Sequence, residues 1–326
     1  MKLGVVGGGA WGTALAQVAS AGGRETILWA LEPEVVEGVN EDHENKAFLA
    51  GIPLNRSIRA TADLGELDDC DAWLVVTPAQ HMRSVLERAA DCDKPLVLCS
   101  KGIEEQSGEL LHRVAKAVCP RAQVAVLSGP TFAHEVANGL PTAVTLAAED
   151  DVLAERLRDR IKQPTFRIYL SDDVAGAEIG GAVKNVLAIA CGVVEGKGLG
   201  QNARAALISR GFAEMTRFGL ALGAKRETLA GLSGLGDLVL TCSSTNSRNY
   251  SLGVGIGQGR RAAELMANRR TVAEGAFTAS VLARLAKDKG VDMPIVDAVD
   301  ALVAGRAGVD EVLGALLSRP SKSEAI

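Results

Sequence analysis

Short apolar runs alternate with amphipathic segments through the first half of the chain. The apolar runs are rich in Val, Leu, Ile and Ala and span residues 2–6, 26–30, 72–76, 95–100, 123–128, 143–147 and 166–170. Segments with helical periodicity lie between them, for example at 13–21, 80–90 and 108–118. This alternation predicts a mostly parallel sheet covered by helices on both faces.

The second half of the chain shows a different pattern. From residue 177 onward there is no convincing strand, and long helical patterns cover 177–195, 201–222, 276–289 and 293–304. A segment rich in Gly, Ser and Asn, 231–259, interrupts them. The turn-rich joint 170–176, where Ser171 or Asp172 could cap the next helix, separates the halves. We therefore expect an α/β domain over 1–174 and an all-α domain over 175–326.

Length and composition narrow the class of protein. A chain of 326 residues favours two domains. A net charge of −5 argues against a general binder of nucleic acid or anionic membranes. The six cysteines and four histidines are scattered, which predicts neither a metal site nor a disulfide framework. No leader is recognisable and no apolar run approaches the ~18 residues of a membrane helix, so we expect no membrane insertion and a cytoplasmic protein.

A glycine motif follows the first apolar run. Gly7, Gly9 and Gly12 stand in the spacing GxGxxG between a predicted strand and a predicted helix. In a Rossmann-type domain such glycines allow the tight turn, the approach of the pyrophosphate and the packing of helix on strand. Glu32 lies about 20 residues beyond, where a ribose-binding carboxylate is expected. The alternative is a tight turn without a ligand, since the motif alone is common.

A lysine lies in the middle of the most apolar helical segment. The neighbours of Lys184 three and four positions away are Gly180, Gly181, Leu187 and Ala188, none of which is anionic. Lysine is almost never fully buried without a partner. Lys184 is either a lysine that reaches water from the helix edge or a functional group whose partner comes from elsewhere in the chain.

Several further motifs carry a resemblance to a known family. They are SKGIE (100–104), SGPTFAHEVANGLPTAV (128–144), GGAVKNVLAIACG (180–192), NARAALISRGFAEM (202–215), GLGDLVLTC (234–242), NSRN (246–249) and VAEG (272–275). With the glycine motif, they resemble bacterial NAD(P)-dependent sn-glycerol-3-phosphate dehydrogenases over almost the whole chain. The resemblance implies interconversion of dihydroxyacetone phosphate and sn-glycerol 3-phosphate, a phospholipid precursor. It also implies a helical domain like that of 6-phosphogluconate dehydrogenase.

The resemblance also implies roles for individual residues. Lys184 would be the catalytic acid and base, with Asp237, Thr241 and Lys101 as the other members of the catalytic group. The substrate would contact Lys101, Gly129, Thr131, Lys184, Asn185, Asp237, Ser247, Arg248 and Asn249. The coenzyme, NAD or NADP, would contact Gly7, Gly9, Ala10, Trp11, Gly12, Leu31, Glu32, Lys101, Ala133, Arg248 and Glu274. No metal is implied.

Elementary chemistry supports these roles. Hydride reduction of a ketone places negative charge on oxygen, where a cation and a proton donor are needed. Lysine can serve as both, and burial would lower its pKa. Asp237 and Thr241, spaced i and i+4, would share a helix face and orient the amine. Each role has an alternative: Asp237 could cap a helix, Arg248 could be an ordinary surface arginine, and Lys101 could be a solvated lysine after a strand.

One position departs from the family pattern. Members often have Arg or His after the second strand, where it can meet the 2′-phosphate of NADP, whereas this chain has Leu31 and Glu32. A carboxylate accepts from a 2′-hydroxyl but repels a 2′-phosphate. We therefore expect a weak preference for NAD, unless Arg24 or Arg56 reaches the site.

Two other functions are weighed against the dehydrogenase. A β-hydroxyacid or 6-phosphogluconate dehydrogenase would share the two-domain plan, but GLGDLVLTC and NSRN favour the glycerol-phosphate pattern. A nucleotide-sensing module without catalysis would not need Lys184, Asp237, Thr241 and Arg248 together. Cys99, Cys191 and Cys242 are expected to be small buried hydrophobic residues, and His134 a surface variation. A homodimer is possible, since it is the commonest soluble oligomer.

Overall fold

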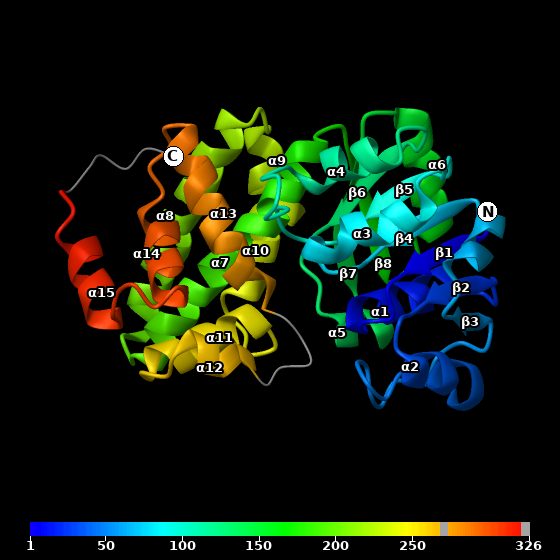
Figure 1. The fold of residues 1–326 in the computed structure, drawn as a ribbon, viewed down its shortest axis with the longest axis horizontal. Coiled ribbons are helices and arrows are strands. Elements are labelled where there is room, and N and C mark those ends of the chain that lie inside the picture. The colour runs from blue at the N-terminus through cyan, green and yellow to red at the C-terminus, as the bar shows by residue number, and fades with distance from the viewer. Residues whose placement is uncertain (268–272, 321–326) are drawn as a thin grey trace. The chain divides into compact units, whose positions relative to one another are not determined.

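The computed structural model of the chain describes residues 1–267 and 273–320, which form two compact units (Figure 1). The first unit contains Met1–Ser100 and Leu111–Val174, and the second contains Lys101–Leu110 and the chain from Ala175 onward. The sequence instead predicts one unbroken domain over 1–174. The segment 101–110 joins the second unit because Ile103 and Leu110 are buried in its helical core.

An eight-stranded sheet organises the first unit in the order β3-β2-β1-β4-β5-β6-β7-β8. The strands are β1 Leu3–Val6, β2 Thr26–Trp29, β3 Ile58–Thr61, β4 Ala72–Val75, β5 Leu96–Leu98, β6 Val124–Ser128, β7 Thr142–Ala148 and β8 Phe166–Ser171. All neighbouring pairs are parallel except β6 and β7, which are antiparallel. The predicted α/β class with a mostly parallel sheet is confirmed.

Helices cover both faces of this sheet. They are α1 Ala10–Ala19, α2 Pro33–Glu37, α3 Met82–Leu86, α4 Leu111–Val118, α5 Ala133–Ala137 and α6 Asp151–Ile161. From β1 the sheet grows towards β2 on one side and towards β4 and β5 on the other. Right-handed crossovers in opposite directions place their helices on opposite faces. The strand order therefore reverses at β1, and the glycine motif lies at this switch point, where open α/β sheets bind ligands.

The strand β3 is absent from the strands predicted by the sequence. It has four residues, and Arg59 within it is exposed because β3 is an edge strand of the sheet. So short a run, broken by a charge, does not stand out from a loop by periodicity. The other seven strands lie in the predicted apolar runs.

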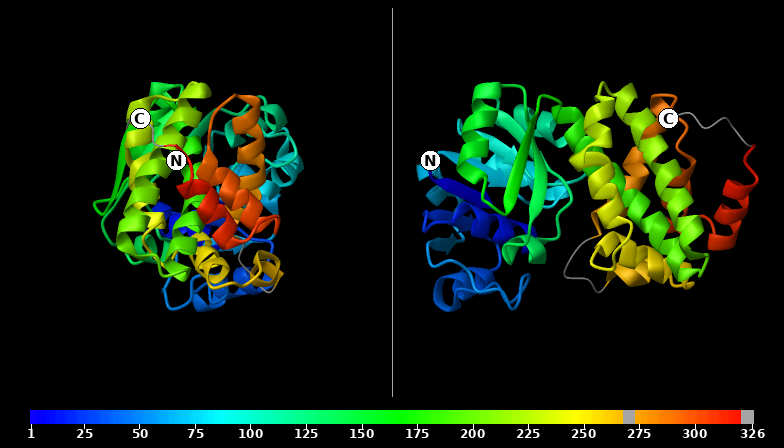
Figure 2. Two further views of the ribbon diagram at one scale, coloured as in Figure 1. Left: turned by 90° about the vertical axis from the view of Figure 1, so that its left-hand side faces the viewer. Right: turned by 180° about the vertical axis from the view of Figure 1, so that it is seen from behind.

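From Ala175 onward, the described residues of the second unit form helices joined by turns and contain no strand (Figure 2). Its helices are α7 Val174–Gly196, α8 Gly200–Ala221, α9 Arg226–Ala230, α10 Asp237–Thr241, α11 Arg248–Gly257, α12 Ala262–Ala267, α13 Glu274–Asp288, α14 Pro294–Val303 and α15 Val309–Leu317. The all-α class is confirmed for these residues. The last helix, α15, was not among the predicted helices.

The helix α7 corrects one expectation from the sequence. By length and composition it could cross a membrane, although the sequence was expected to contain no such run. Its most apolar window is completely buried inside the unit, with side chains such as Val186 and Ile189 in the core. A buried core helix meets the same criteria as a membrane span, so α7 is weak support for membrane insertion.

The glycine-rich segment 231–259 also differs from the prediction, because it contains helices α10 and α11. Gly253 of α11 lies so close to α7 that a Cβ atom would be 2.0 Å from the carbonyl oxygen of Ile189. Gly257 and, on α7, Gly192 and Gly196 approach the other helix equally closely. Glycines four residues apart thus form the contact face of both helices. They serve close packing here and do not break the helices.

We expect Gly253→Ala to destabilise the second unit by about 3 kcal/mol or more, because its methyl group would overlap backbone that cannot move aside. Gly314→Ala is the matched control. Gly314 lies within α15 with open space around it, so alanine should stabilise the chain by about 0.5–1 kcal/mol. Urea unfolding of both variants measures the difference. Equal effects of the two substitutions would contradict the close helix contact.

Candidate active site

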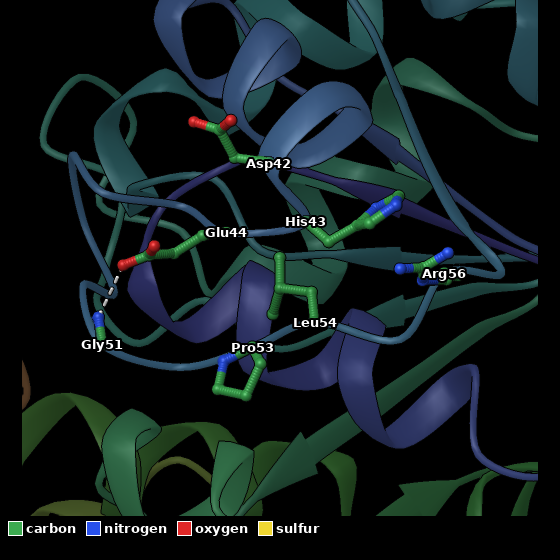
Figure 3. A pocket seen from close by; sticks show the side chains of 7 residues that line it. All are labelled: Asp42, His43, Glu44, Gly51, Pro53, Leu54 and Arg56. Atoms are coloured by element: carbon green, nitrogen blue, oxygen red, sulfur yellow. Dashed lines mark hydrogen bonds between the residues drawn. The ribbon is translucent and has the colours of Figure 1, made fainter.

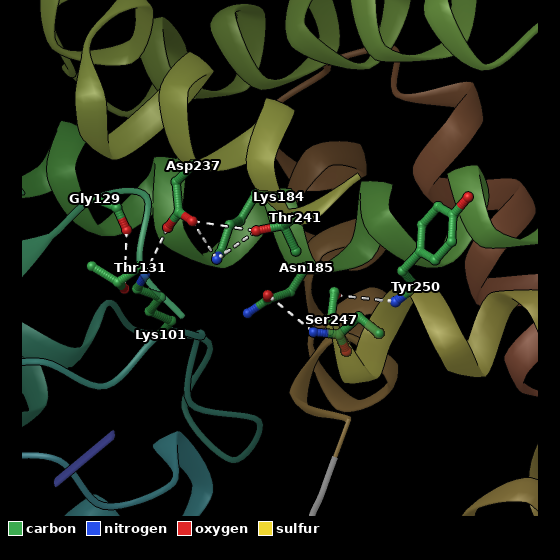
Figure 4. A network of polar contacts seen from close by, with 10 residues as sticks. Lys101, Gly129, Thr131, Lys184, Asn185, Asp237, Thr241, Ser247 and Tyr250 are labelled. Atoms are coloured by element: carbon green, nitrogen blue, oxygen red, sulfur yellow. Dashed lines mark hydrogen bonds and ion pairs between the residues drawn. The ribbon is translucent and has the colours of Figure 1, made fainter. Parts of the chain in front are cut away.

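The buried amine of Lys184 has its partners on a different helix. The central turn of α7 carries Lys184, and the short helix α10 carries Asp237 and Thr241 at its two ends. The Lys184 Nζ donates to Asp237 Oδ1 at 2.6 Å and to Thr241 Oγ1 at 2.9 Å (Figure 4). Thr241 Oγ1 in turn donates to Asp237 Oδ1 at 3.3 Å. The spacing i, i+4 places both partners on one face of α10.

A second lysine reaches the same carboxylate. Lys101 Nζ donates to Asp237 Oδ2 at 2.6 Å, so that the two oxygens of Asp237 each hold one ammonium group. The Asp237 side chain is fully buried, Lys184 is 7% exposed and Lys101 is 13% exposed. Lys101 reaches this site because the segment 101–110 belongs to the second unit. It is an ion-paired lysine and not the solvated lysine of the alternative reading.

The surroundings tune the proton affinity of Lys184. The pKa of Lys184 is lowered to about 8, chiefly by burial and also by the nearby charge of Lys101, while the charge and hydrogen bond of Asp237 act in the opposite direction. The protonated and neutral forms of the amine are therefore both accessible near neutral pH. A group with this property can give a proton to an oxygen and take it back in the reverse direction.

The packing around this site explains why residue 180 is a glycine. A Cβ atom there would lie 2.4 Å from the carbonyl oxygen of Ser233, in the π-helical turn Leu232–Gly236 that leads into α10. The glycine lets this turn approach α7, which places Asp237 against Lys184. Backbone of the turn therefore fills the space that a side chain at residue 180 would need.

Polar side chains gather at the start of α11. Ser247 caps the helix by accepting from the amide of Tyr250 at 3.2 Å, and exposed Arg248 is its first residue. Buried Asn249 donates to Asn185 Oδ1 at 3.0 Å. These residues combine a helix N-terminus with a guanidinium group, both of which favour anions.

Asn185 and Asn249 also hold three helices together. The Asn249 Oδ1 atom accepts from the amide of Gly275, at the start of α13, at 3.0 Å. A Cβ at Gly275 would lie 2.5 Å from the carbonyl oxygen of Asn185, so α7 and α13 touch here. Glu274 is half-buried and opens α13. The motif residue Val272 lies outside the described residues.

The glycine motif of the first unit fits a dinucleotide. Gly7 has a φ of 125°, which favours glycine, and a Cβ at Gly12 would lie 1.8 Å from the carbonyl oxygen of Gly7. Gly9, by contrast, has open space where a Cβ would be. Gly9 is the N-cap residue of α1, and no side chain caps this helix. The first turn, which begins with Ala10 and Trp11, contains no acidic residue. The first amides of α1 therefore remain available to an anion.

Other predicted residues of the first unit lie beyond β6. A Cβ at Gly129 would be 2.9 Å from the Cα atom of Val144 in β7, so close packing demands glycine here. Thr131 Oγ1 donates to the carbonyl oxygen of Gly129 at 3.3 Å, and Ala133 begins α5. Ser128, the last residue of β6, has a buried hydroxyl without a hydrogen-bond partner among the described residues.

Two further buried polar atoms lack partners in the described part of the chain. They are Trp11 Nε1 and Thr77 Oγ1. Thr77 follows the carboxyl end of β4, and Trp11 lies in the first turn of α1. Unpaired buried polar atoms are uncommon and call for a partner. Their position at the carboxyl edge of the sheet is consistent with a bound polar ligand.

The residues after β2 lie where the coenzyme preference is expected to be set. Leu31 is 63% exposed, and half-buried Glu32 is the N-cap of α2. Arg24 precedes β2, and Arg56 precedes the parallel strand β3, so both lie at the amino edge of the sheet. The suggestion that either arginine reaches the site is wrong, because Leu31 lies beyond the opposite edge. The Arg24 guanidinium donates instead to the carbonyl oxygen of Arg160.

A surface pocket of the first unit contains none of the predicted site residues. Figure 3 shows it beside the loop before β3, lined by Asp42, His43, Glu44, Gly51, Pro53, Leu54 and Arg56. Glu44 accepts from the amide of Gly51 across the loop at 2.8 Å. The lining carries charges of both signs and shows no preference for one kind of ligand.

The predictions for three cysteines and one histidine are confirmed. Cys99, Cys191 and Cys242 are buried with free thiols, and His134 is exposed. Burial raises the pKa of the Cys242 thiol well above its usual value. The three cysteines are therefore packing residues, and Cys242 has no thiolate character.

A Rossmann-type unit followed by a helical unit with a buried lysine is the plan of two-domain nucleotide-dependent oxidoreductases. Family models for the N-terminus and the C-terminus of NAD-dependent glycerol-3-phosphate dehydrogenase match residues 2–154 and 173–314. The chain belongs to this family.

Whole-chain relatives support the family assignment. A protein of Erythrobacter litoralis named glycerol-3-phosphate dehydrogenase (NAD(P)+) is 62% identical over 323 residues, covering 99% of this chain and 98% of the relative. A protein of the same name from Novosphingobium aromaticivorans is 63% identical over 326 residues, with the same coverage. The crystal structure of glycerol-3-phosphate dehydrogenase from Coxiella burnetii is 36% identical, with a TM-score of 0.93, covering 98% of this chain and 99% of that one.

Proposed function

We propose that this chain interconverts dihydroxyacetone phosphate and sn-glycerol 3-phosphate with NAD(P)H and so feeds glycerophospholipid synthesis. The observation that carries the proposal is the buried amine of Lys184, held by Asp237 and Thr241. An ion pair buried only for stability gains little over apolar packing. A lysine with a pKa of about 8 instead suits proton transfer at a carbonyl oxygen.

The coenzyme would be held by the glycine motif and its surroundings. Gly7, Gly9 and Gly12 shape the turn, and the first amides of α1 face the phosphates. Leu31 and Glu32 would contact the adenosine, and Ala10, Trp11, Ala133, Lys101, Arg248 and Glu274 are further proposed contacts. When bound, NAD(P)H supplies the hydride that reduces the carbonyl carbon.

Lys184 provides the proton for the same reduction. Asp237 Oδ1 and Thr241 Oγ1 take two of its three N–H bonds, which leaves the third for the substrate oxygen. As negative charge develops on that oxygen, the ammonium group stabilises it and then transfers its proton. In the oxidation of glycerol phosphate the neutral amine removes the proton. Asp237 keeps the amine in position by its hydrogen bond, and the charges of Asp237 and Lys101 together help to set the pKa of the amine.

The substrate phosphate would bind at the start of α11. Ser247, Arg248 and Asn249 supply a hydroxyl, a guanidinium group and an amide there, and the helix N-terminus adds a partial positive charge. Asn185, Gly129 and Thr131 are the other proposed substrate contacts. A dianionic phosphate far from the reacting carbonyl gives binding energy that orients the carbonyl.

Turnover of purified protein tests the proposal. Oxidation of NADH or NADPH is followed by absorbance with dihydroxyacetone phosphate. Reduction of NAD+ or NADP+ is followed in the same way with 6-phosphogluconate and with a β-hydroxyacid. We expect turnover with the triose phosphate only. If the folded protein reduces dihydroxyacetone phosphate neither with NADH nor with NADPH, the proposed function is overturned.

We expect a higher kcat/KM for NADH than for NADPH, because the Glu32 carboxylate repels a 2′-phosphate and Leu31 stands where related enzymes often have a basic residue. Leu31→Arg should raise kcat/KM for NADPH about tenfold by adding a charge-assisted contact. Leu140→Arg, at another exposed leucine of the first unit, adds the same charge elsewhere and should change little. A wild-type preference for NADPH would contradict this assignment.

A small phosphorylated substrate is the partner implied by this chemistry. The proposed cytoplasmic location agrees with a substrate and coenzyme that are both soluble metabolites. The proposed homodimer would show in sedimentation equilibrium as twice the chain mass of 33.9 kDa.

A further inference from the structure

Asn45 is a fully buried polar residue that contacts the glycine motif from a distant part of the chain. Its Nδ2 donates to the carbonyl oxygen of Gly8 at 2.8 Å and to Thr13 Oγ1 at 2.7 Å. The Thr13 hydroxyl donates to the same carbonyl oxygen at 3.3 Å. The Asn45 Oδ1 accepts from the amide of Phe48 at 3.1 Å. Both amide hydrogens and the carbonyl of this side chain are therefore in use.

These bonds fix the orientation of one peptide group. The peptide between Gly8 and Gly9 is trans, so its N–H points away from its carbonyl. Asn45 and Thr13 hold the carbonyl on one side, which turns the Gly9 amide to the other. The peptide cannot shift far, because a Cβ at Gly8 would already lie 2.5 Å from the Cβ of Ala30.

We propose that Asn45 is a positioning residue for the coenzyme phosphates, with Thr13 as its relay. It holds the Gly9 amide, and with it the first turn of α1, in the orientation that receives a pyrophosphate. This inference rests on the proposed function, which assigns the glycine motif to the coenzyme. Because the amides are oriented before binding, no free energy of binding is spent on ordering them.

The role of Asn45 is separable from the anchoring of its loop. The far end of the loop is tied to α1 by Gln17, whose Oε1 accepts from the amide of Asn55 at 2.9 Å. Asn55 Nδ2 donates to the carbonyl oxygen of Ser20 at 3.0 Å. These contacts do not involve Asn45, so removing its amide should disturb the glycine motif without releasing the whole loop.

The test compares Asn45→Ala and Asn45→Asp in the full chain. NADH affinity is measured directly by fluorescence titration, and kcat and both KM values by steady-state assay. We expect the Kd for NADH to rise about tenfold or more, because the Gly8 carbonyl loses its shorter hydrogen bond, from Asn45, and keeps only the longer one from the Thr13 hydroxyl. Asn45→Asp should be worse, since its carboxylate would face that carbonyl. The kcat at saturating NADH should stay within about threefold, and the KM for dihydroxyacetone phosphate should not change.

Asn40→Ala is the matched control. Asn40 donates to the carbonyl oxygen of Ala60 at 2.9 Å and accepts from its amide at 2.8 Å. The substitution thus removes two hydrogen bonds to backbone, as Asn45→Ala does, from a neighbouring segment, and both of these bonds go to β3 and not to the glycine motif. We expect Asn40→Ala to lower the melting temperature and to leave the Kd for NADH unchanged.

Three results would decide against the inference. They are a wild-type Kd for NADH in both Asn45 variants, an equal loss of affinity in Asn40→Ala, and a change confined to kcat. If neither Asn45 variant folds, Thr13→Val decides, and an unchanged Kd there overturns the inference. A wild-type protein that binds NADH but does not reduce dihydroxyacetone phosphate would overturn the proposed function alone, because the Kd values still test Asn45.

Discussion

Replacing Lys184 with methionine is expected to lower kcat for dihydroxyacetone phosphate reduction about 10²–10⁴-fold, the usual contribution of a general acid. Methionine fills a similar volume, but its side chain carries no charge and has no acidic proton to donate to the substrate oxygen. Asp237 keeps Lys101 and Thr241 as partners, so the carboxylate is not left unpaired and the unit should remain folded. Circular dichroism and thermal unfolding verify the fold.

Lys197→Met serves as the control for Lys184→Met. Lys197 follows α7 directly and forms an exposed ion pair with Asp310 at 2.8 Å. Its loss should change kcat by less than about twofold, because exposed ion pairs contribute little. If Lys184→Met kept more than a tenth of wild-type kcat, Lys184 would not be the proton donor.

The same lysine sets the pH dependence of the two directions. With a pKa of about 8, Lys184 is mostly protonated below pH 8 and mostly neutral above it. Ketone reduction needs the protonated form, so its single-turnover rate should fall as pH rises through about 8. Alcohol oxidation needs the neutral form, and its rate should rise over the same interval. Both titrations should vanish in Lys184→Met.

The second large effect is expected for Asp237→Asn. The carboxylate raises the pKa of Lys184 by charge and by hydrogen bond, so its loss should lower that pKa. The limb of the reduction profile near pH 8 should then move about 1–3 pH units lower. Activity at pH 7.5 should fall about threefold for a shift of one unit and more than about a hundredfold for a shift of three, because the protonated fraction of Lys184 falls by these factors. A variant with reduced activity but an unshifted profile would show that Asp237 does not control the charge of Lys184.

Asp237→Asn should also destabilise the second unit by about 3 kcal/mol, because two buried ammonium groups lose their counter-charge. The sign of the pH effect follows from Lys184, whose pKa in the folded chain lies below its unfolded value. The folded state then binds fewer protons, so the stability of the variant should recover as pH rises. Thr241→Val removes a hydroxyl group but no charge. It should therefore change the free energy of unfolding and the pH profile of reduction less than Asp237→Asn does. Chemical unfolding at pH 6, 7.5 and 9 measures this.

The local pattern of the sequence was sufficient for most of the first unit. Parallel strands buried on both faces appear as continuous apolar runs, and seven of the eight strands were recognisable in this way. The strand β3 was not, because an exposed edge with Arg59 has neither a continuous run nor enough length for a period. The partner of Lys184 was expected from the family motif GLGDLVLTC, and no local pattern pointed to it.

What the sequence could not provide depends on contacts between distant segments. The glycines of α11 look like helix breakers until α7 lies against them. Asn45 is 37 residues from Gly8 and has no motif of its own. The pairing of Lys101 with Asp237 requires a segment between two elements of the first unit to enter the core of the second. None of these has a periodic or compositional signal, because each is fixed by tertiary packing.

The path of segment 101–110 limits how the enzyme can be divided. A fragment that begins at Ala175 would lack Ile103 and Leu110 from its core and would leave Asp237 with one ammonium group in place of two. A fragment that ends at Val174 would carry those apolar side chains without the core that buries them. Chimaeras with relatives should therefore exchange residues 101–110 together with the second unit. A single junction at residue 174 would combine the carboxylate of one parent with the lysine of the other.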